Sequence, residues 1–285
     1  EKMEFRMLNT KNFGRALVAG VTATVLAFAA ACGSTGAQNN SASETVTDGK
    51  LTVATGEPAY TPWVLNNKPE SGEGYEAAVI YAVAKELGYK DSDVKWTRST
   101  FDSAIAPGAK DWDMNIQQFS ITEDRKKAVD FSPSYYNTTQ AMVVQSDNKF
   151  ANATSLADLK DAVIGSMTGT TSYEQAKAKI KDDIKLYNNN DDAVAALSSG
   201  QIDVLVVDTP TAVNMVESGQ AGKTGKVLGQ IADSEDKEGM GILLPKGSKL
   251  TAKVTKAINT LQENGTLKQL QDKWLSAYTT LTVLK

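Results

Sequence analysis

The sequence predicts an α/β fold, because strand-like and helix-like segments alternate from residue 50 onward. The first strand is the apolar run LTVAT at 51–55. The segment 74–89 has apolar residues at the helical period and stops near Gly88. The chain has 285 residues, 41% hydrophobic and 22% charged, which is typical of one or two domains with substantial cores. Alternation of this kind predicts mostly parallel sheets with helices on both faces.

The other elements follow the same alternation. In the first half we expect a strand at 93–99, a short helix and a strand within 101–118, and a helix capped by Thr122 with Glu123 and Asp124 in its first turn. In the second half we expect a strand at 162–166, a helix from Ser172 with Gln175 in the capping-box position, a helix at 191–200, a strand at 202–208, and a helix with Thr209 as N-cap and Pro210 at N1.

The first 31 residues have the character of a signal peptide. A leader with four basic residues precedes an apolar run of roughly 15 residues, which is too short to span a bilayer. The run ends at Cys32, in a placement that resembles the lipobox of bacterial lipoproteins, where the cysteine is lipidated. Residues 32–48 are rich in Gly, Ser and Asn and predict a flexible tether. An ordinary secretory signal with an incidental cysteine is the alternative.

Composition excludes several functional classes. Removal of residues 1–31 takes away four cations and two anions and changes the net charge from −4 to −6. An acidic protein of this kind is a poor partner for nucleic acid or anionic lipid. The absence of histidine excludes a histidine-based triad and a histidine-ligated metal, and one cysteine excludes an intrachain disulfide. The sequence predicts neither a metal nor a cofactor.

The stretch QQFSITEDRKKAVDFS, at 117–132, contains one arginine next to a strand end. Arg125 projects near the carboxyl end of the strand, where ligands bind in open α/β sheets. Its planar guanidinium can bind a carboxylate through two parallel hydrogen bonds. A surface salt bridge with Glu123 or Asp124 is the alternative.

A second anion site is predicted at GTTSYEQ, at 169–175. Gly169, Thr170 and Thr171 lie at a helix N-terminus after a strand. Unpaired N–H groups and the helix dipole make such a terminus a carboxylate site. A purely structural turn is the alternative.

Two motifs resemble those of a known family. SITEDRKKAVDFSPSYY, at 120–136, resembles S-x-T-x-x-R followed by D-F-S-x-x-Y-Y, and ENGTLKQLQDKW, at 263–274, resembles the family's terminal helix. The chain resembles, over about 50–278, the bacterial solute-binding proteins of amino-acid ABC transporters, of the lysine/arginine/ornithine, histidine and glutamine type. The resemblance implies the type II periplasmic-binding-protein fold: two α/β lobes joined by two crossing strands that act as a hinge.

The resemblance also implies a domain organisation. Lobe 1 takes residues 49–137 and 241–279, and lobe 2 takes residues 141–235. The crossings are NTTQAMVV, at 137–144, and KEGMGILL, at 237–244. One large doubly wound sheet is the alternative.

The resemblance assigns roles to residues that match the family's motifs. Arg125 matches the arginine that binds the ligand α-carboxylate, and Ser120 matches the serine that assists it. Thr170 and Thr171 contribute from the other lobe. Asp208, at the end of the strand IDVLVVD, matches the aspartate that pairs with the α-ammonium group. A capping role in the next helix is the alternative for Asp208.

The side-chain pocket is expected to be partly aromatic. The implied members are Tyr60, Trp63, Phe101, Glu57 and Gln118. Core packing is the alternative for the tryptophan and the phenylalanine. Gln118, like its neighbour Gln117, departs from the small residues that are common in the family, and its amide offers both donors and acceptors.

The implied function is that of a membrane-anchored substrate-binding component of an ABC importer. It would act as a monomer, trap a polar or basic amino acid between its lobes, and deliver it to the permease and ATPase complex. Acidic ligands rank last, because no second cation aligns with the pocket and an unpaired buried carboxylate is costly. The alternative is a dehydratase or murein-cleaving relative, for which Glu57 is the candidate acid or base.

Overall fold

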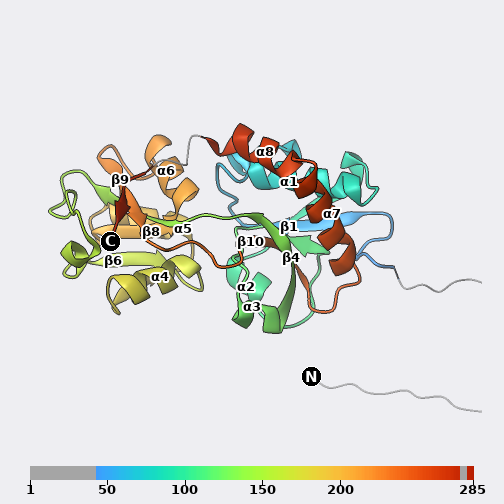
Figure 1. Ribbon diagram of the computed structural model, residues 1–285, viewed down its shortest axis with the longest axis horizontal. Helices are drawn as coiled ribbons and strands as arrows, with labels where there is room; N and C mark the ends of the chain where they lie inside the picture. Colours follow the sequence, from blue (N-terminus) through green and yellow to red (C-terminus); the bar gives the residue numbers. More distant parts are fainter. Residues whose placement is uncertain (1–42, 277–280) are drawn as a thin grey trace, which may run out of the picture. The chain divides into compact units, whose positions relative to one another are not determined.

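The computed structural model describes residues 43–276 and 281–285. The predicted signal peptide, the lipidation site Cys32 and most of the predicted tether lie outside the described residues. The described part contains two β-sheets, each with helices on both faces (Figure 1). No helix within it is both long enough and apolar enough to cross a membrane.

The first sheet has five strands in the order β2-β1-β3-β10-β4. Its strands are β1 (Leu51–Thr55), β2 (Val94–Arg98), β3 (Met114–Asn115), β4 (Val129–Tyr136) and β10 (Met240–Pro245). Its helices are α1 (Tyr75–Glu86), α2 (Phe101–Ile105), α3 (Glu123–Ala128), α7 (Thr251–Glu263) and α8 (Thr266–Trp274). Alternate strand residues serve opposite faces: Val53 packs with α1, α7 and α8, whereas Ala54 packs with Phe101 of α2.

The second sheet has six strands in the order β11-β9-β5-β8-β6-β7. Its strands are β5 (Gln140–Gln145), β6 (Ile164–Met167), β7 (Ile184–Tyr187), β8 (Val204–Asp208), β9 (Gly225–Ile231) and β11 (Val283–Leu284). Its helices are α4 (Thr171–Lys179), α5 (Asn190–Ser198) and α6 (Thr209–Glu217). Val206 packs on the same side as Ala176 of α4, and Val207 packs on the side of α5 and α6.

The two sheets are mixed, so the expectation of mostly parallel sheets is only partly correct. β1 is parallel to β2 and β3, and β6 is parallel to β7 and β8. β10 is antiparallel to β3 and β4, and β5 is antiparallel to β8 and β9. β5 and β10 are the strands that the chain enters directly after crossing from the other sheet. Because no βαβ connection links either strand to its neighbours in its own sheet, these two strands need not be parallel to them.

The chain passes between the sheets twice through short extended segments. Residues 137–139 connect β4 to β5, and residues 232–239 connect β9 to β10. The two crossings lie side by side, because the Asn137 side-chain amide donates to the Asp236 carbonyl at 3.0 Å. The Ile121 N–H donates to the Gly239 carbonyl at 2.8 Å, so the second crossing also contacts the segment that carries the S-x-T motif.

Both ends of the described chain add contacts that the sequence did not predict. Residues 43–48, expected in the tether, contact the first sheet: Thr45 is buried, and the Val46 N–H donates to the Asp113 carboxylate at 2.7 Å. At the other end, β11 joins the second sheet beside β9, although α8 packs with the first.

We expect Gly239→Ala to destabilise the protein more than Gly247→Ala does. Both glycines have positive φ, +73° and +74°, so an added Cβ costs roughly 1 kcal/mol at either position. At Gly239 the Cβ would also lie 2.1 Å from the Ser134 hydroxyl and 2.8 Å from the Tyr136 carbonyl, whereas it meets nothing within 4 Å at Gly247. Chemical denaturation measures both variants, and equal losses of unfolding free energy would contradict this account of the crossing.

Candidate functional site

A pocket lies where residues of the two sheets face each other. It is lined by nine of the ten residues predicted to bind ligand: Arg125, Asp208, Thr171, Thr170, Ser120, Gln118, Phe101, Tyr60 and Glu57. Gln117 also lines it. These nine residues, predicted from the sequence to form one site, do line one cavity, although they are spread over more than 150 positions of the chain.

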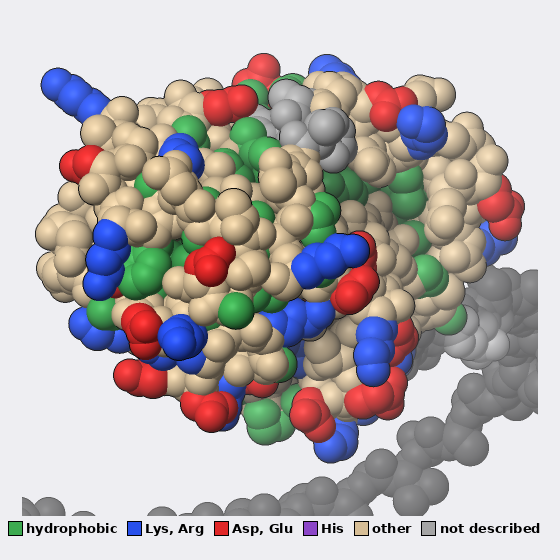
Figure 2. Space-filling model, turned by 60° about the vertical axis from the view of Figure 1, so that its left-hand side comes forward, with side chains coloured by type: hydrophobic (Ala, Val, Ile, Leu, Met, Phe, Trp, Pro, Cys, Tyr) green, Lys and Arg blue, Asp and Glu red, His purple; other side chains and the backbone are tan. Residues whose placement is uncertain are grey.

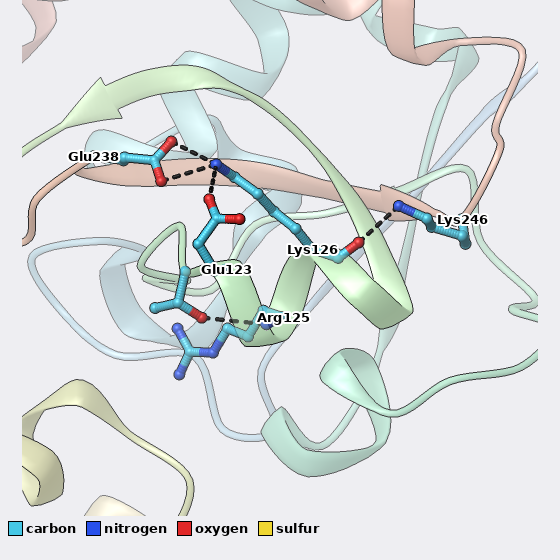
Figure 3. Close-up of polar contacts among 6 residues, drawn as sticks. Glu123, Arg125, Lys126, Glu238 and Lys246 are labelled. Atoms are coloured by element: carbon cyan, nitrogen blue, oxygen red, sulfur yellow. Dashed lines mark hydrogen bonds and ion pairs between the residues drawn. The ribbon is translucent and has the colours of Figure 1, made fainter.

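Helix α3 positions Arg125. The Thr122 hydroxyl accepts from the Arg125 N–H at 3.2 Å, which confirms the predicted N-cap. The side chain is 9% exposed, and its Nη1 donates to the Ser120 carbonyl at 2.7 Å. The two acids considered as salt-bridge partners of Arg125 pair with lysines instead, Glu123 with Lys126 and Asp124 with Lys127. In Figure 3, Lys126 extends toward Glu238, whereas the guanidinium of Arg125 points away from this ion-paired cluster.

Three hydrogen bonds join the two lobes at the pocket. Nη2 of Arg125 donates to the Gly169 carbonyl at 2.8 Å. The hydroxyls of Ser120 and Thr171 lie 3.0 Å apart. The Trp63 indole N–H donates to the Thr211 hydroxyl at 3.1 Å. Each of these contacts involves at least one residue that lines the pocket.

Acidic side chains surround the guanidinium. The pKa of Asp208 is raised to about 7, mainly by burial and also by the negative charge of Asp236, while the Gln140 amide, which donates to Asp208 at 2.9 Å, acts in the opposite direction. Burial also raises the pKa of Asp236, against the lowering effects of the Ser120 hydroxyl and the Arg125 charge. Asp236 is 8% exposed, and its Oδ2 has no hydrogen-bond partner. The cation at the site thus faces an excess of carboxyl groups.

The aromatic residues divide between the pocket and the core. Phe101 stacks on Phe119 with ring centroids 4.9 Å apart, and the Arg125 guanidinium carbon lies 5.2 Å from the Phe101 ring centroid. Tyr60 lines the pocket, and its hydroxyl is buried. Burial and the charge of Asp191 raise the pKa of Tyr60 to about 12, so this hydroxyl stays protonated.

The expectation that Trp63 lines the pocket is not met. Trp63 is fully buried in the core of the first lobe and packs edge-on against Tyr136 at 5.5 Å. It acts on the pocket only through its hydrogen bond to Thr211, which does line the cavity. The core alternative is therefore correct for this residue.

Glu57 lies at the pocket edge with a cationic neighbour that the sequence did not indicate. Its carboxylate is 3.4 Å from Nε of Arg98, and its side chain is 56% exposed. Arg98 is fixed by bonds to the Gly56 carbonyl and to Asn67. Because this carboxylate already has a partner, Glu57 favours a ligand cation less than an unpaired acid would.

Two helix caps differ from those expected. Helix α4 begins at Thr171, and the Thr170 hydroxyl accepts from the Tyr173 N–H at 3.2 Å, so Thr170 is the N-cap. Gln175 makes no capping box, since its Oε1 is buried without a partner. Thr209 is the first residue of α6 rather than its cap, because its hydroxyl donates to the Thr139 carbonyl at 2.9 Å.

Asp208 occupies the cap position of α6 but makes no side-chain capping bond. The alternative role considered for this aspartate, as a capping residue, is therefore not the role of its carboxylate. The carboxylate instead accepts from the Gln140 amide, and Asp208 lines the pocket.

Several pocket residues were missed by sequence reasoning. Asn188, Asn189 and Asn190 line the cavity directly after β7. A run of three asparagines after a parallel strand was a usable signal, because such strands end at the ligand edge of the sheet. Asp236 does not line the cavity, but its charge acts on Arg125 and Asp208, and its place in a crossing segment carried no signal of this kind.

Comparison with known proteins places the chain in a family. Residues 51–277 match the bacterial extracellular solute-binding proteins, family 3. The match covers most of the chain, so the protein belongs to this family and is a solute-binding protein that works outside the cytoplasm. The resemblance inferred from the two motifs is thereby confirmed.

Individual relatives agree in sequence and fold. The L-arginine-binding protein of Pseudomonas aeruginosa is 31% identical over 227 residues, which cover 77% of this chain and 86% of that protein. The arginine-binding extracellular protein ArtP of Bacillus subtilis is 29% identical over 253 residues, or 86% and 92% of the two chains. The structure of an ancestral arginine-binding protein bound to arginine is 32% identical with a TM-score of 0.67, and covers 80% of this chain and 98% of its own. The fold is the predicted type II periplasmic-binding-protein fold.

We expect Asp208→Asn to stabilise the ligand-free protein more at pH 8 than at pH 5. The folded-state pKa of about 7 exceeds the ordinary value near 4, so folding takes up a proton between these pH values. The wild-type unfolding free energy therefore falls as the pH rises through this window, by up to about 1.4 kcal/mol per pH unit. Denaturant titrations at both pH values measure the gain. The exposed Asp182→Asn is the matched control, and a gain independent of pH would contradict the assigned shift.

Proposed function

We propose that the pocket binds one amino acid, basic or polar, between the two lobes. Arg125 and Ser120 would receive the α-carboxylate from one side, and the backbone N–H of Thr171 from the other. Asp208 would pair with the α-ammonium group. The observation that carries this proposal is a buried guanidinium and a buried carboxylate lining one cavity, which suits the two charges of a zwitterion.

Arg125 retains donors for such a ligand. Two of its five N–H groups donate to the carbonyls of Ser120 and Gly169, one in each lobe. These bonds fix the plane of the guanidinium and leave its other donors for a carboxylate. Phe101, stacked beneath the cation, limits its movement further.

The charge around the pocket favours a basic or amide side chain in the ligand. Three buried acids, Asp208, Asp236 and Glu76, outnumber the one guanidinium, and a ligand cation would reduce this excess. The unpartnered Oε1 of Gln117 and the hydroxyl of Tyr60 offer further polar contacts. Relatives support this class, because an ancestral arginine-binding protein has been solved with arginine and also with glutamine.

Ligand binding would be coupled to lobe closure. The proposed lobes are residues 49–137 with 241–279, and residues 141–235. A ligand held by Arg125 on one lobe and by Asp208 on the other contacts both only when the lobes are together, so it favours the closed state. As a monomer, the closed protein would then deliver its ligand to the permease and ATPase of an ABC importer.

We infer that the protein is a carrier and not an enzyme. An ancestral amino acid-binding protein described as a precursor of cyclohexadienyl dehydratase has this fold, with 30% identity and a TM-score of 0.64. Catalysis would need a positioned acid or base. Glu57, the candidate from sequence, is largely exposed and ion-paired with Arg98. Asp208, whose pKa is near 7, is assigned to the ligand ammonium group.

Charged side chains of both signs lie on one face of the molecule (Figure 2). On the face shown in Figure 2, basic and acidic side chains are interspersed and do not gather into one patch.

We also propose that Cys32 carries a lipid anchor. Changing Cys32 to Ser should move the protein from the membrane fraction to the soluble fraction, because the acyl chains would supply the membrane affinity. Immunoblots of fractionated cells measure this, with Ser34→Ala as the control. Continued membrane association of the Cys32→Ser protein would show that another segment anchors it.

We expect Arg125→Lys to weaken arginine binding by about 10- to 100-fold, because lysine keeps the charge but loses the two-pronged contact with the carboxylate. Arg125→Ala should weaken it further. Isothermal titration calorimetry of the protein measures the affinity. Lys127→Ala, on the same helix and exposed, is the control. An unchanged affinity in both Arg125 variants would refute the proposed carboxylate site.

A further inference from the structure

Glu76 is a buried acid behind the pocket to which no role has been assigned. It lies in the first turn of α1 and is fully buried. Its Oε1 accepts from the Gln118 backbone N–H at 2.8 Å and also from the Tyr135 hydroxyl. Its Oε2 accepts from the Gln118 side-chain Nε2. Both carboxyl oxygens therefore have donors, and two of the three donors belong to one residue of the pocket wall.

Gln118 is held in an unusual backbone conformation at this wall. Its φ is +52°, in the left-handed region that side chains other than glycine adopt at a cost of roughly 1 kcal/mol. Glu76 holds both its main-chain N–H and its amide N–H groups. A strained residue that is fixed twice by one acid and lines a cavity is typical of a positioned functional group.

The direction of the Gln118 amide follows from these bonds. An ionised carboxylate only accepts hydrogen bonds, so with Glu76 ionised the amide turns its NH₂ group toward it. The amide oxygen is then the atom left for the ligand. The same wall offers a second acceptor, because Oε1 of Gln117 is buried without a partner.

We propose that Glu76 is a positioning residue that fixes the Gln118 amide with its oxygen toward the ligand, so that the pocket selects amino acids whose side chains carry N–H donors. This inference rests on the proposed amino-acid site and deepens it. The selected class includes arginine, lysine and glutamine, whereas glutamate presents only acceptors to the same oxygen.

A glutamine at position 76 would reverse the arrangement. Its oxygen would keep the bonds from Tyr135 and the Gln118 main chain, and its NH₂ group would take the place of Oε2. Two NH₂ groups would then face each other, so the Gln118 amide would turn over and present its N–H groups to the ligand. Glu76→Gln should therefore shift preference from glutamine toward glutamate.

The experiment measures the affinities for glutamine and glutamate, two ligands of nearly the same shape, by calorimetry. We expect the wild type to prefer glutamine and Glu76→Gln to reduce this preference at least about tenfold, which corresponds to one charge-assisted hydrogen bond. Glu86→Gln makes the same chemical change at an exposed position of the same helix and should leave the preference unchanged.

Removal of a buried negative charge would by itself favour glutamate, so a second background separates the two effects. Gln118→Gly removes the amide and suits the positive φ. Adding Glu76→Gln to Gln118→Gly should change the preference less than twofold if Gln118 transmits the effect. A change as large as in the wild-type background would overturn the proposal, because charge alone would then explain it.

Two further outcomes distinguish this inference from the proposed function. If the wild type binds no amino acid, the proposed function fails and the inference fails with it. If the wild type binds glutamine but Gln118→Gly retains the full preference over glutamate, only the inference is overturned. The Gln118→Gly comparison also decides the matter should Glu76→Gln fail to fold, as judged by circular dichroism.

Discussion

The buried guanidinium of Arg125 is the constraint on which the site depends. A buried charge costs several kcal/mol unless it is paired and hydrogen-bonded. Here a capped helix fixes the side chain, a carbonyl from each lobe accepts from it, and an aromatic ring lies beneath it. Because one of these carbonyls, that of Gly169, belongs to the other lobe, full hydrogen bonding of Arg125 requires the lobes to be together.

Three buried acids at or behind the pocket are electrostatically unfavourable when they are ionised. With burial as the main cause, the pKa values of Glu76 and Asp208 are raised to about 7. Burial raises the pKa of Asp236 as well. Near neutral pH this arrangement costs stability, and the proposed pairing of Asp208 with a ligand ammonium group would relieve that cost. Under the proposed function, the same charges would contribute to ligand affinity and would link binding to the closed state.

Sequence reasoning succeeded where the signal is local. Thr122 and Arg125 lie three residues apart at a strand end, and Asp208 ends an apolar strand, so their positions follow from short-range rules. It failed where burial is set by distant parts of the chain. In the sequence, Glu76 is an ordinary acidic residue in the first turn of a helix. Its hydrogen-bond partners Gln118 and Tyr135 lie more than 40 positions further along the chain, so its burial has no local signal. Trp63 was assigned to the pocket because its packing against Tyr136 has no local signature. The β11 strand was missed because two residues are too few to carry a pattern.

The central claim is that an amino acid joins the two lobes. The most direct measurement is the distance between spin labels at Lys127 on α3 and Ala178 on α4, both exposed, recorded by pulsed electron paramagnetic resonance with and without arginine. The account predicts that saturating arginine narrows the distance distribution and shifts it to shorter values. Binding of arginine, shown by calorimetry on the same labelled sample, with an unchanged distance distribution would contradict it.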